Sequence, residues 1–248
     1  MKTIDLNADL GEGYDDGAVM PHISSANIAC GFHAGDAETM HRTVELCVQH
    51  GVAIGAHPSL PDRVGFGRRE MEVSPDEVYA QTLYQIGALA GIANATGAKL
   101  HHVKPHGALY NMAARERALA DAIARAVRDF DPDLILVGLA GSASITAARD
   151  TGLARAQEAF CDRRYRSDGS LTARSQHGSV LEDIDEAVAQ AVSLATRGEA
   201  IADDGSRVRL QADTLCVHGD RANAGEFARR LREALEQTGL RVAAPERT

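Results

Sequence analysis

Residues 26–56 read ANIACGFHAGDAETMHRTVELCVQHGVAIGA and contain a strand–helix–strand pattern. A short apolar run, Ala26–Cys30, leads through a polar, glycine-containing stretch to Asp36, where a helical pattern begins that ends at Gly51. A second apolar run, Val52–Ala56, follows directly. Two such runs joined by a helix predict parallel strands, because strands separated by a helical crossover must run in the same direction.

The same alternation extends toward both ends of the chain. The predicted strands are short apolar runs bounded by glycine or polar residues, which is typical of strands buried on both faces. They are Thr3–Ala8, Ala26–Cys30, Val52–Ala56, Leu100–Lys104, Leu134–Gly138, Arg155–Phe160 and Thr214–His218. Between two of them, Ser74, Pro75 and Glu77 form a capping box for a helix that runs to about Ala95. We expect an α/β fold with a parallel sheet, and periodicity leaves open whether the sheet closes into a barrel.

Composition excludes several classes of function. The 248 residues carry a net charge of −9 and only 4% aromatics, which disfavours binding of nucleic acid phosphates and bases. The longest apolar run, Leu134–Ala140, is far shorter than the ~20 residues that span a bilayer, and Asp5 lies where a signal peptide would be apolar. The four cysteines show no C-x-x-C spacing, which favours a reducing compartment. We expect one domain over residues 1–248, in the cytoplasm, with no nucleic acid or membrane partner.

Ionisable residues concentrate directly after the predicted strands. The carboxyl ends of parallel strands face the same way, so these residues are expected to converge on one rim, where α/β folds place active sites. Carboxylates and histidines can transfer protons or activate water, and lysine and arginine can bind a small anion and stabilise an oxyanion. The expected catalytic residues are Asp9, Glu12, His33, His57, Lys104 and His106. The expected substrate-binding residues are Asp36, Asp62, Arg68, Asp162, Arg163, Arg164, Arg174, His218 and Asp220.

Several of these residues also have simpler interpretations. Asp36 and Asp220 precede helical patterns and can serve as helix N-caps. The cysteines are better read as small buried apolar residues than as nucleophiles. His101 and His102 lie within a predicted strand, so at most one of them faces the interior.

Two questions about cofactors arise from the same residues. Asp9, His33 and His57, on three strand ends, could hold a divalent metal with a bound water, but ligands from separate strands have no fixed spacing to test. The run Gly138–Ser142 follows a predicted strand but lacks the G-x-x-x-x-G-K-[ST] pattern of a nucleotide-binding loop.

At these same residues the sequence resembles the LamB/YcsF family, from Asp5 to about Gly239. The motifs that carry the resemblance are DLNADLGE at residues 5–12, ANIACGFHAGD at 26–36, GAHP at 55–58, GFGR at 65–68, VKPHGALY at 103–110 and CVHGD at 216–220. The resemblance implies a seven-stranded TIM-like barrel related to glycoside hydrolase and deacetylase barrels. It also implies ATP-dependent cleavage of 5-oxo-L-proline to L-glutamate, as one component of a 5-oxoprolinase that acts together with subunits B and C.

For that reaction, the residues suggest a division of roles. Lys104 and one or more arginines would hold anionic groups, Asp9 or Glu12 would activate water, and His57 or His106 would protonate the departing nitrogen. Subunits B and C would perform or assist a phosphorylation that consumes ATP. Two other functions stay open at this point: a metal-dependent deacetylase or amidase acting on sugars, and a non-catalytic regulatory subunit.

Overall fold

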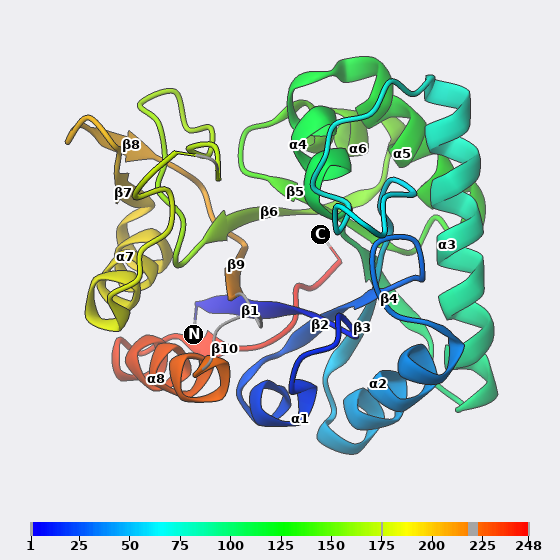
Figure 1. The fold of residues 1–248 in the computed structure, drawn as a ribbon. Helices are drawn as coiled ribbons and strands as arrows, with labels where there is room; N and C mark the ends of the chain where they lie inside the picture. The colour runs from blue at the N-terminus through cyan, green and yellow to red at the C-terminus, as the bar shows by residue number, and fades with distance from the viewer. Residues whose placement is uncertain (1, 175, 218–222, 248) are drawn as a thin grey trace.

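Within the described residues, seven parallel strands close into a barrel that is surrounded by helices (Figure 1). The computed structural model describes residues 2–174, 176–217 and 223–247. In order around the barrel, the strands are β1 (Thr3–Leu10), β2 (Ser25–Ala29), β3 (Ala53–His57), β4 (Leu100–Val103), β5 (Ile135–Leu139), β6 (Ala154–Phe160) and β9 (Thr214–Val217). Strand β9 pairs with both β6 and β1, which closes the barrel. This TIM-like α/β barrel confirms the expected fold class.

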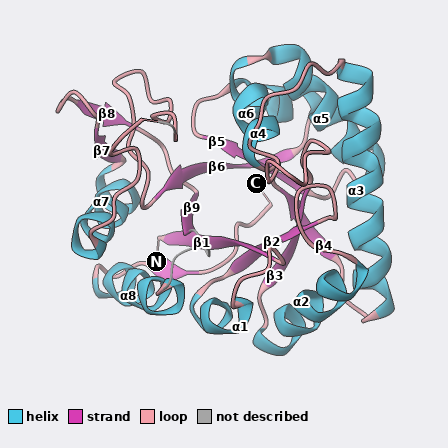
Figure 2. Ribbon diagram, in the orientation of Figure 1, coloured by secondary structure: helices cyan, strands magenta, loops and turns pink. Residues whose placement is uncertain are grey.

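Helices connect the strands and pack outside the barrel (Figure 2). In chain order they are α1 (Asp16–Val19), the short 3-10 helix η1 (Met20–His22), α2 (Ala37–His50), α3 (Pro75–Ala95), α4 (Gly107–Arg115), α5 (Arg117–Phe130), α6 (Ala143–Thr151), α7 (Ile184–Arg197) and α8 (Ala224–Gln237). A two-residue strand, β10 (Arg241–Val242), follows α8 and pairs with the start of β1. Around the barrel, the strands β1 to β6 and β9 follow one another in the same order as in the chain.

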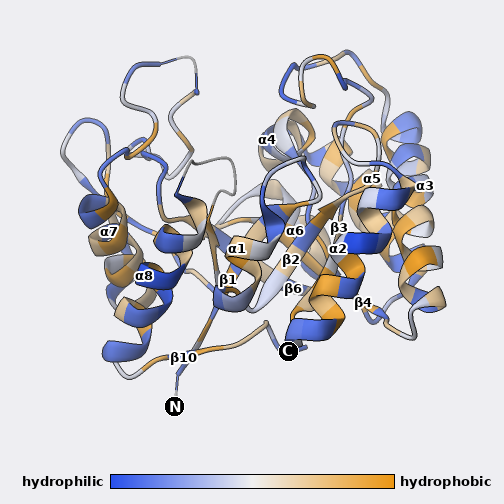
Figure 3. Ribbon diagram, turned by 60° about the horizontal axis from the view of Figure 1, so that its bottom comes forward, coloured by the Kyte–Doolittle hydropathy of each residue, from blue (hydrophilic) through white to orange (hydrophobic). Residues whose placement is uncertain are grey.

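The helices place hydrophobic residues on the face toward the barrel and hydrophilic residues on the outer face (Figure 3). In α8, Phe227, Leu231 and Leu235 are fully buried at the spacing of one helical face. Helix α3 begins with the predicted capping box, in which the Ser74 side chain accepts from the Glu77 amide and the Glu77 carboxylate accepts from the Ser74 amide. No helix in the described ranges combines the length and the apolar character that a membrane span requires.

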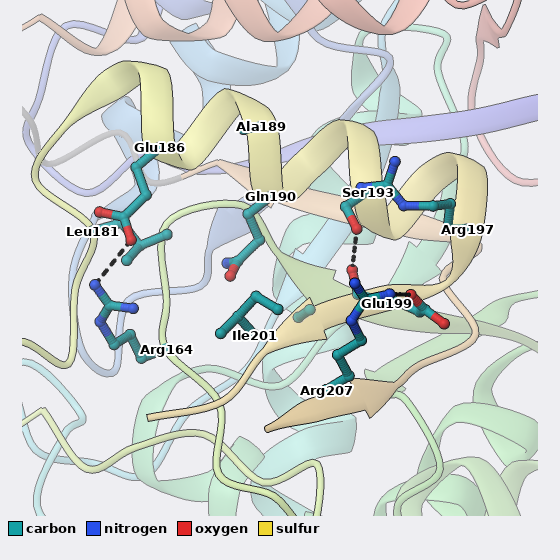
Figure 4. Close-up of a pocket in the computed structure, with 11 residues that line it drawn as sticks. Arg164, Leu181, Glu186, Ala189, Gln190, Ser193, Arg197, Glu199, Ile201 and Arg207 are labelled. Carbon is teal, nitrogen blue, oxygen red and sulfur yellow. Dashed lines mark hydrogen bonds and ion pairs between the residues drawn. The ribbon is translucent and has the colours of Figure 1, made fainter. Parts of the chain in front are cut away.

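The long connection from β6 to β9 contains a small second sheet that the sequence patterns did not predict. Strands β7 (Glu199–Ile201) and β8 (Arg207–Arg209) form an antiparallel hairpin after α7. Between this hairpin and α7 lies a groove of about 540 Å³, shown in Figure 4. At one end of the groove, Arg164 is paired with Glu186 at 2.9 Å. The lining residues come from α7, the hairpin and the segment between β6 and α7, and none of them belongs to a barrel strand.

All four cysteines are buried and free. Burial raises the pKa of Cys30 and of Cys47 to about 12, so both remain neutral thiols at physiological pH. Because a nucleophilic cysteine needs a lowered pKa, the structure agrees with their interpretation as small buried residues.

Asp5 is a buried carboxylate at the end of the barrel opposite the strand carboxyl termini. Its oxygens accept hydrogen bonds from Ser24 at 2.7 Å, from Ser25 at 2.8 Å and from Thr214. Burial outweighs these hydrogen bonds and raises the pKa of Asp5 from 3.8 to about 6. The folded protein therefore binds a proton at Asp5 in a pH range where the unfolded chain does not.

This shift predicts a measurable dependence of stability on pH. A raised carboxyl pKa contributes stability that is complete below pH 3.8 and is lost as the pH rises through about 6. Relative to Asp5→Asn, which cannot titrate there, we expect the wild-type free energy of unfolding to rise by about 2–2.5 kcal/mol between pH 7 and pH 4. Urea unfolding of both proteins across this range measures the difference, and a difference that does not change with pH would contradict the burial of a titrating Asp5.

Candidate active site

A cavity of about 790 Å³ opens at the carboxyl end of the barrel. Its walls come from the carboxyl ends of β1, β3, β5 and β6 and from the segments that follow β1, β3, β4, β5 and β6. Helices α4 and α6 begin at its wall, with His106 and Ser142 as their N-caps, and helix N-termini favour anions. The predicted site residues that line the cavity are Asp9, Glu12, His57, Arg68, Lys104, His106, Arg163 and Arg174.

A buried lysine lies on the floor of the cavity. The Lys104 ammonium is 2.9 Å from Asp9 Oδ1 and 2.8 Å from Glu158 Oε1, and its side chain is only 2% exposed. It also donates to Asn7 Oδ1 at 3.2 Å. Burial alone would lower the pKa of Lys104, but the two carboxylates outweigh it and hold this pKa well above its ordinary value. The lysine is therefore a fixed positive charge.

Glu158 is a part of this network that the sequence patterns missed. It is fully buried on β6, and its Oε1 also accepts a hydrogen bond from Asn7 at 3.0 Å. The available signal was a charged residue directly before the apolar end of the strand, Ala159–Phe160, since a charge among buried apolar residues needs a buried partner.

Three histidines and two carboxylates surround the floor next to Lys104. His57 Nε2 lies 3.3 Å from Asp9 Oδ2 and 3.0 Å from His106 Nδ1. His33 lies behind His106, outside the cavity lining, with the two rings stacked at 3.8 Å between centroids. His33 Nε2 is 2.8 Å from Glu12 Oε1. The structure thus brings all six predicted catalytic residues into one cluster.

Burial and neighbouring charges move the pKa values of this cluster apart. Burial would raise the pKa of Asp9, but His57 and Lys104 hold it well below its ordinary value. Burial would lower the pKa of His57, but the Asp9 carboxylate raises it. The pKa of His106 is lowered by burial and by the charges of His57 and His33, and burial likewise lowers the pKa of His33. Asp9 is therefore an ionised carboxylate at neutral pH.

Two glycines let a loop close over these histidines. Gly67 has φ +63°, and a Cβ there would lie 2.9 Å from both the His106 ring and His33 Cβ. Gly107 has φ +56°, and a Cβ on it would lie 2.5 Å from the Gly67 carbonyl oxygen. This close approach lets the Gly67 carbonyl accept from the Ala108 amide and the Phe66 carbonyl accept from His106.

Arginines give the upper cavity a positive charge, although the chain as a whole is acidic. Arg163 is held in place by donating to the Thr172 carbonyl at 2.7 Å, and burial lowers its pKa only to about 10, so it stays charged. Arg68 lies over the Phe66 ring at 4.8 Å, and Arg174 lines the same wall. Arg115 and Arg166, which the sequence patterns did not single out, also line the cavity.

Four predicted substrate-binding residues lie outside this cavity. Asp36 is exposed and caps α2 by accepting from the Thr39 amide, which is the simpler of its two interpretations. Asp62 is paired with Arg69 and accepts from the Gly65 amide, so it holds its own loop together. Asp162, two residues after β6, is buried and does not line the cavity, and Arg164 lines the groove beside α7. His218 and Asp220 lie outside the described residues.

Comparison with known proteins places the chain in a family. The sequence model of the LamB/YcsF family matches residues 4–248. The chain belongs to the LamB/YcsF family. A relative from Bordetella parapertussis, named as the A subunit of 5-oxoprolinase, is 56% identical over 97% of this chain and 98% of its own length. A relative of the same name from Tolumonas auensis is 55% identical over 98% of this chain and 100% of its own.

Solved structures show the same fold in this family and beyond it. The lactam utilization protein from Thermus thermophilus is 52% identical, with a TM-score of 0.92 over 98% of this chain and 100% of its own. A polysaccharide deacetylase from Bacillus cereus has a TM-score of 0.52 over 99% of this chain and 93% of its own, at 10% identity. The second likeness is one of fold alone, and it shows that the LamB/YcsF barrel resembles deacetylase barrels.

Proposed function

We propose that this chain is the A subunit of a 5-oxoprolinase, which opens the lactam ring of 5-oxo-L-proline to give L-glutamate. The names of its relatives and of the Thermus thermophilus structure support this function, since the matches cover almost the whole chain. The observation that carries it is the arrangement of the cavity, where the buried Asp9–Lys104 pair lies on the floor and arginines line the wall. A small molecule with one carboxylate and one amide fits these groups.

The chemistry of the substrate explains the need for both Asp9 and Lys104. A five-membered lactam is a resonance-stabilised amide, so its opening requires a nucleophile at the carbonyl carbon and a proton on the departing nitrogen. Asp9 is ionised and sits at the floor, so it accepts a proton from the attacking water and returns it to the nitrogen. Lys104 lies 2.9 Å from Asp9, where its fixed charge stabilises the negative charge that builds up on the oxygens of the attacked carbon.

The two histidines that line the cavity fit less well as proton donors than the sequence suggested. His57 Nδ1 is 2.7 Å from the Lys104 carbonyl and His106 Nε2 is 2.9 Å from the Phe66 carbonyl. A neutral imidazole has one N–H, which both rings use on the backbone, and a second proton on His57 would lie on Nε2, where Asp9 Oδ2 holds it at 3.3 Å. We therefore assign the proton on the departing nitrogen to Asp9.

ATP enters this proposal through the partner subunits. Transfer of the γ-phosphate of ATP to the amide oxygen activates the amide carbon toward water, and we assign this step to subunits B and C. Expulsion of the ring nitrogen then leaves an acyl phosphate, which a second water hydrolyses to the carboxylate of glutamate and inorganic phosphate. The absence of a nucleotide-binding loop pattern from the sequence supports this division. A cytoplasmic location, where ATP is available, belongs to the same proposal.

Reconstitution tests the proposed function. We expect the chain mixed with subunits B and C to form glutamate from 5-oxo-L-proline only when ATP is present, and any mixture lacking one of the three to form none. ATP-coupled turnover by this chain alone would contradict the division of labour. Release of acetate from N-acetylated sugars without ATP, and no release of glutamate, would instead support the metal-dependent deacetylase that the histidine–carboxylate cluster also allows.

The arginines that line the wall predict an effect on substrate affinity. Arg68→Gln removes a charged donor from the cavity while leaving Asp9 and Lys104 in place. A hydrogen bond between charged groups is worth about 1.5–3 kcal/mol, so we expect KM for 5-oxo-L-proline to rise ~10- to 100-fold with kcat changed much less. Arg149→Gln, at an exposed position of α6, is the matched control. An unchanged KM would show that Arg68 does not bind the substrate.

A further inference from the structure

Several atoms that can bind a cation converge on the cavity floor. Single ligand atoms of Glu12, His33, His57 and His106 all lie within 4.8 Å of one another. His57 Nε2 is 3.0 Å from His106 Nδ1. Glu12 Oε1 is 3.4 Å from His106 Nδ1 and 3.8 Å from His57 Nε2. Three of the four side chains, those of Glu12, His57 and His106, also line the cavity.

The backbone fixes which ring nitrogens carry hydrogen. The Lys104 and Phe66 carbonyl oxygens can only accept, so His57 Nδ1 and His106 Nε2, at 2.7 Å and 2.9 Å from them, are the donors. The other nitrogen of each neutral ring, His57 Nε2 and His106 Nδ1, then presents a lone pair. When both rings are neutral, these two lone pairs face each other at 3.0 Å with the carboxylates of Glu12 and Asp9 beside them at 3.4 Å and 3.3 Å, an arrangement that a positive charge between the atoms stabilises.

The spacing of the three atoms fits a metal ion better than a proton. A shared proton joins one pair of atoms, whereas here the ligand atoms of Glu12, His57 and His106 lie 3.0, 3.4 and 3.8 Å from one another, and Asp9 Oδ2 lies 3.3 Å from His57 Nε2. Ligand bonds of about 2.0–2.1 Å at tetrahedral angles place ligand atoms ~3.3 Å apart around zinc. Backbone carbonyls on the far ring nitrogens are also the usual contacts that orient metal-bound histidines.

The side chains around these three atoms indicate which residues are available as metal ligands. His33 Nδ1 has no hydrogen-bond partner among the described residues, whereas His33 Nε2 is 2.8 Å from Glu12 Oε1. Nε2 is therefore the donor, and it orients the Glu12 carboxylate. Asp9 Oδ1 accepts from Lys104 and from Asn27, both at 2.9 Å. Of the set Asp9, His33 and His57 considered from the sequence, His57 belongs to these three side chains, His33 orients Glu12, and Asp9 Oδ2 lies beside them at 3.3 Å from His57 Nε2.

We infer that Glu12, His57 and His106 form a binding site for one divalent transition-metal cation, best matched by zinc. Two imidazoles and a carboxylate are ligands that zinc accepts, and three protein ligands leave a fourth position. That position faces the cavity, because all three ligands line it. A cation there would polarise a carbonyl oxygen or a water next to Asp9, which fits the proposed ring opening, but its binding does not depend on that function.

Metal binding by the full chain alone tests this site. After treatment with a chelator, the chain is incubated with zinc and separated from free ions by gel filtration, and its metal content is measured by mass spectrometry. We expect about one zinc ion per wild-type chain and a loss of at least ~10-fold in His106→Gln and Glu12→Gln. His41→Gln, at a histidine whose side chain is 51% exposed on α2, should keep the wild-type content.

Thermal unfolding separates loss of the site from loss of the fold. Zinc should raise the Tm of the wild-type chain and of His41→Gln, and should leave the Tm of the two site variants unchanged, with normal circular dichroism spectra in all four proteins. A wild-type chain that retains no zinc, or site variants that retain as much as the wild type, would overturn the inference. Because subunits B and C are not present, failure of the oxoprolinase assay leaves this result unaffected.

Discussion

Replacing Lys104 with methionine is expected to lower kcat of the assembled enzyme about 10²- to 10³-fold, the usual cost of removing an oxyanion-stabilising group. The same change leaves Asp9 and Glu158 as buried carboxylates without their shared cation, which lies 2.9 Å and 2.8 Å from them. Removing one partner of a buried ion pair costs about 3–5 kcal/mol, so the free energy of unfolding should fall by that amount. Steady-state kinetics and urea unfolding measure the two effects.

Two further variants separate these effects. Lys99→Met changes a lysine at an exposed position just before β4 and should alter neither kcat nor stability. Adding Glu158→Gln to Lys104→Met removes one unpaired charge, so the double variant should regain part of the lost stability but none of the lost kcat. A Lys104→Met protein with wild-type kcat would show that the buried lysine only supports the fold.

Replacing Asp9 with asparagine is expected to lower kcat about 10²- to 10⁴-fold, the usual contribution of a general base. Asparagine has the same shape, and its oxygen can still accept from Lys104 and Asn27, which donate to Asp9 Oδ1 at 2.9 Å. The substrate carboxylate is assigned to the arginines on the wall, so KM should change much less than kcat. Kinetics of the reconstituted enzyme with this variant give both constants.

The same experiment separates a catalyst from a regulatory component. If this chain only docks a ligand or a partner, Asp9→Asn mixed with subunits B and C would keep nearly full glutamate formation. Asp76→Asn, at an exposed position in the first turn of α3, serves as the control for the loss of one carboxylate. Retained turnover in a folded Asp9→Asn protein would rule out the assigned role of Asp9.

The sequence was sufficient to predict the barrel strands because each is a short apolar run between polar segments. The seven strands begin and end within two residues of the predicted bounds, with His218 outside the described residues. Closure of the sheet was not readable from periodicity, because strands in open sheets and in barrels are buried alike. The β7–β8 hairpin escaped prediction because its strands have three residues each, too few to show an alternation.

The site was predictable where a residue directly follows a strand and less so elsewhere. Asp9 near the end of β1, His57 at the end of β3 and Lys104 after β4 meet because parallel strands share one carboxyl end. His102 is the interior one of the two strand histidines, with Nε2 at 2.9 Å from Asn27 Oδ1. Asp36 was ambiguous, since a residue after a strand is also the residue before the next helix. The pairing of Asp62 with Arg69 depends on a loop conformation that no pattern encodes.

A crystal structure of the assembled enzyme with 5-oxo-L-proline, in the absence of ATP, tests the assignment of this cavity most directly. We expect the lactam inside the barrel-end cavity, with its carboxylate on Arg68 or Arg174 and its carbonyl toward Asp9 and Lys104. A lactam bound at another place on the chain or on one of its partners, with this cavity empty at saturating ligand, would contradict the proposed function of the site.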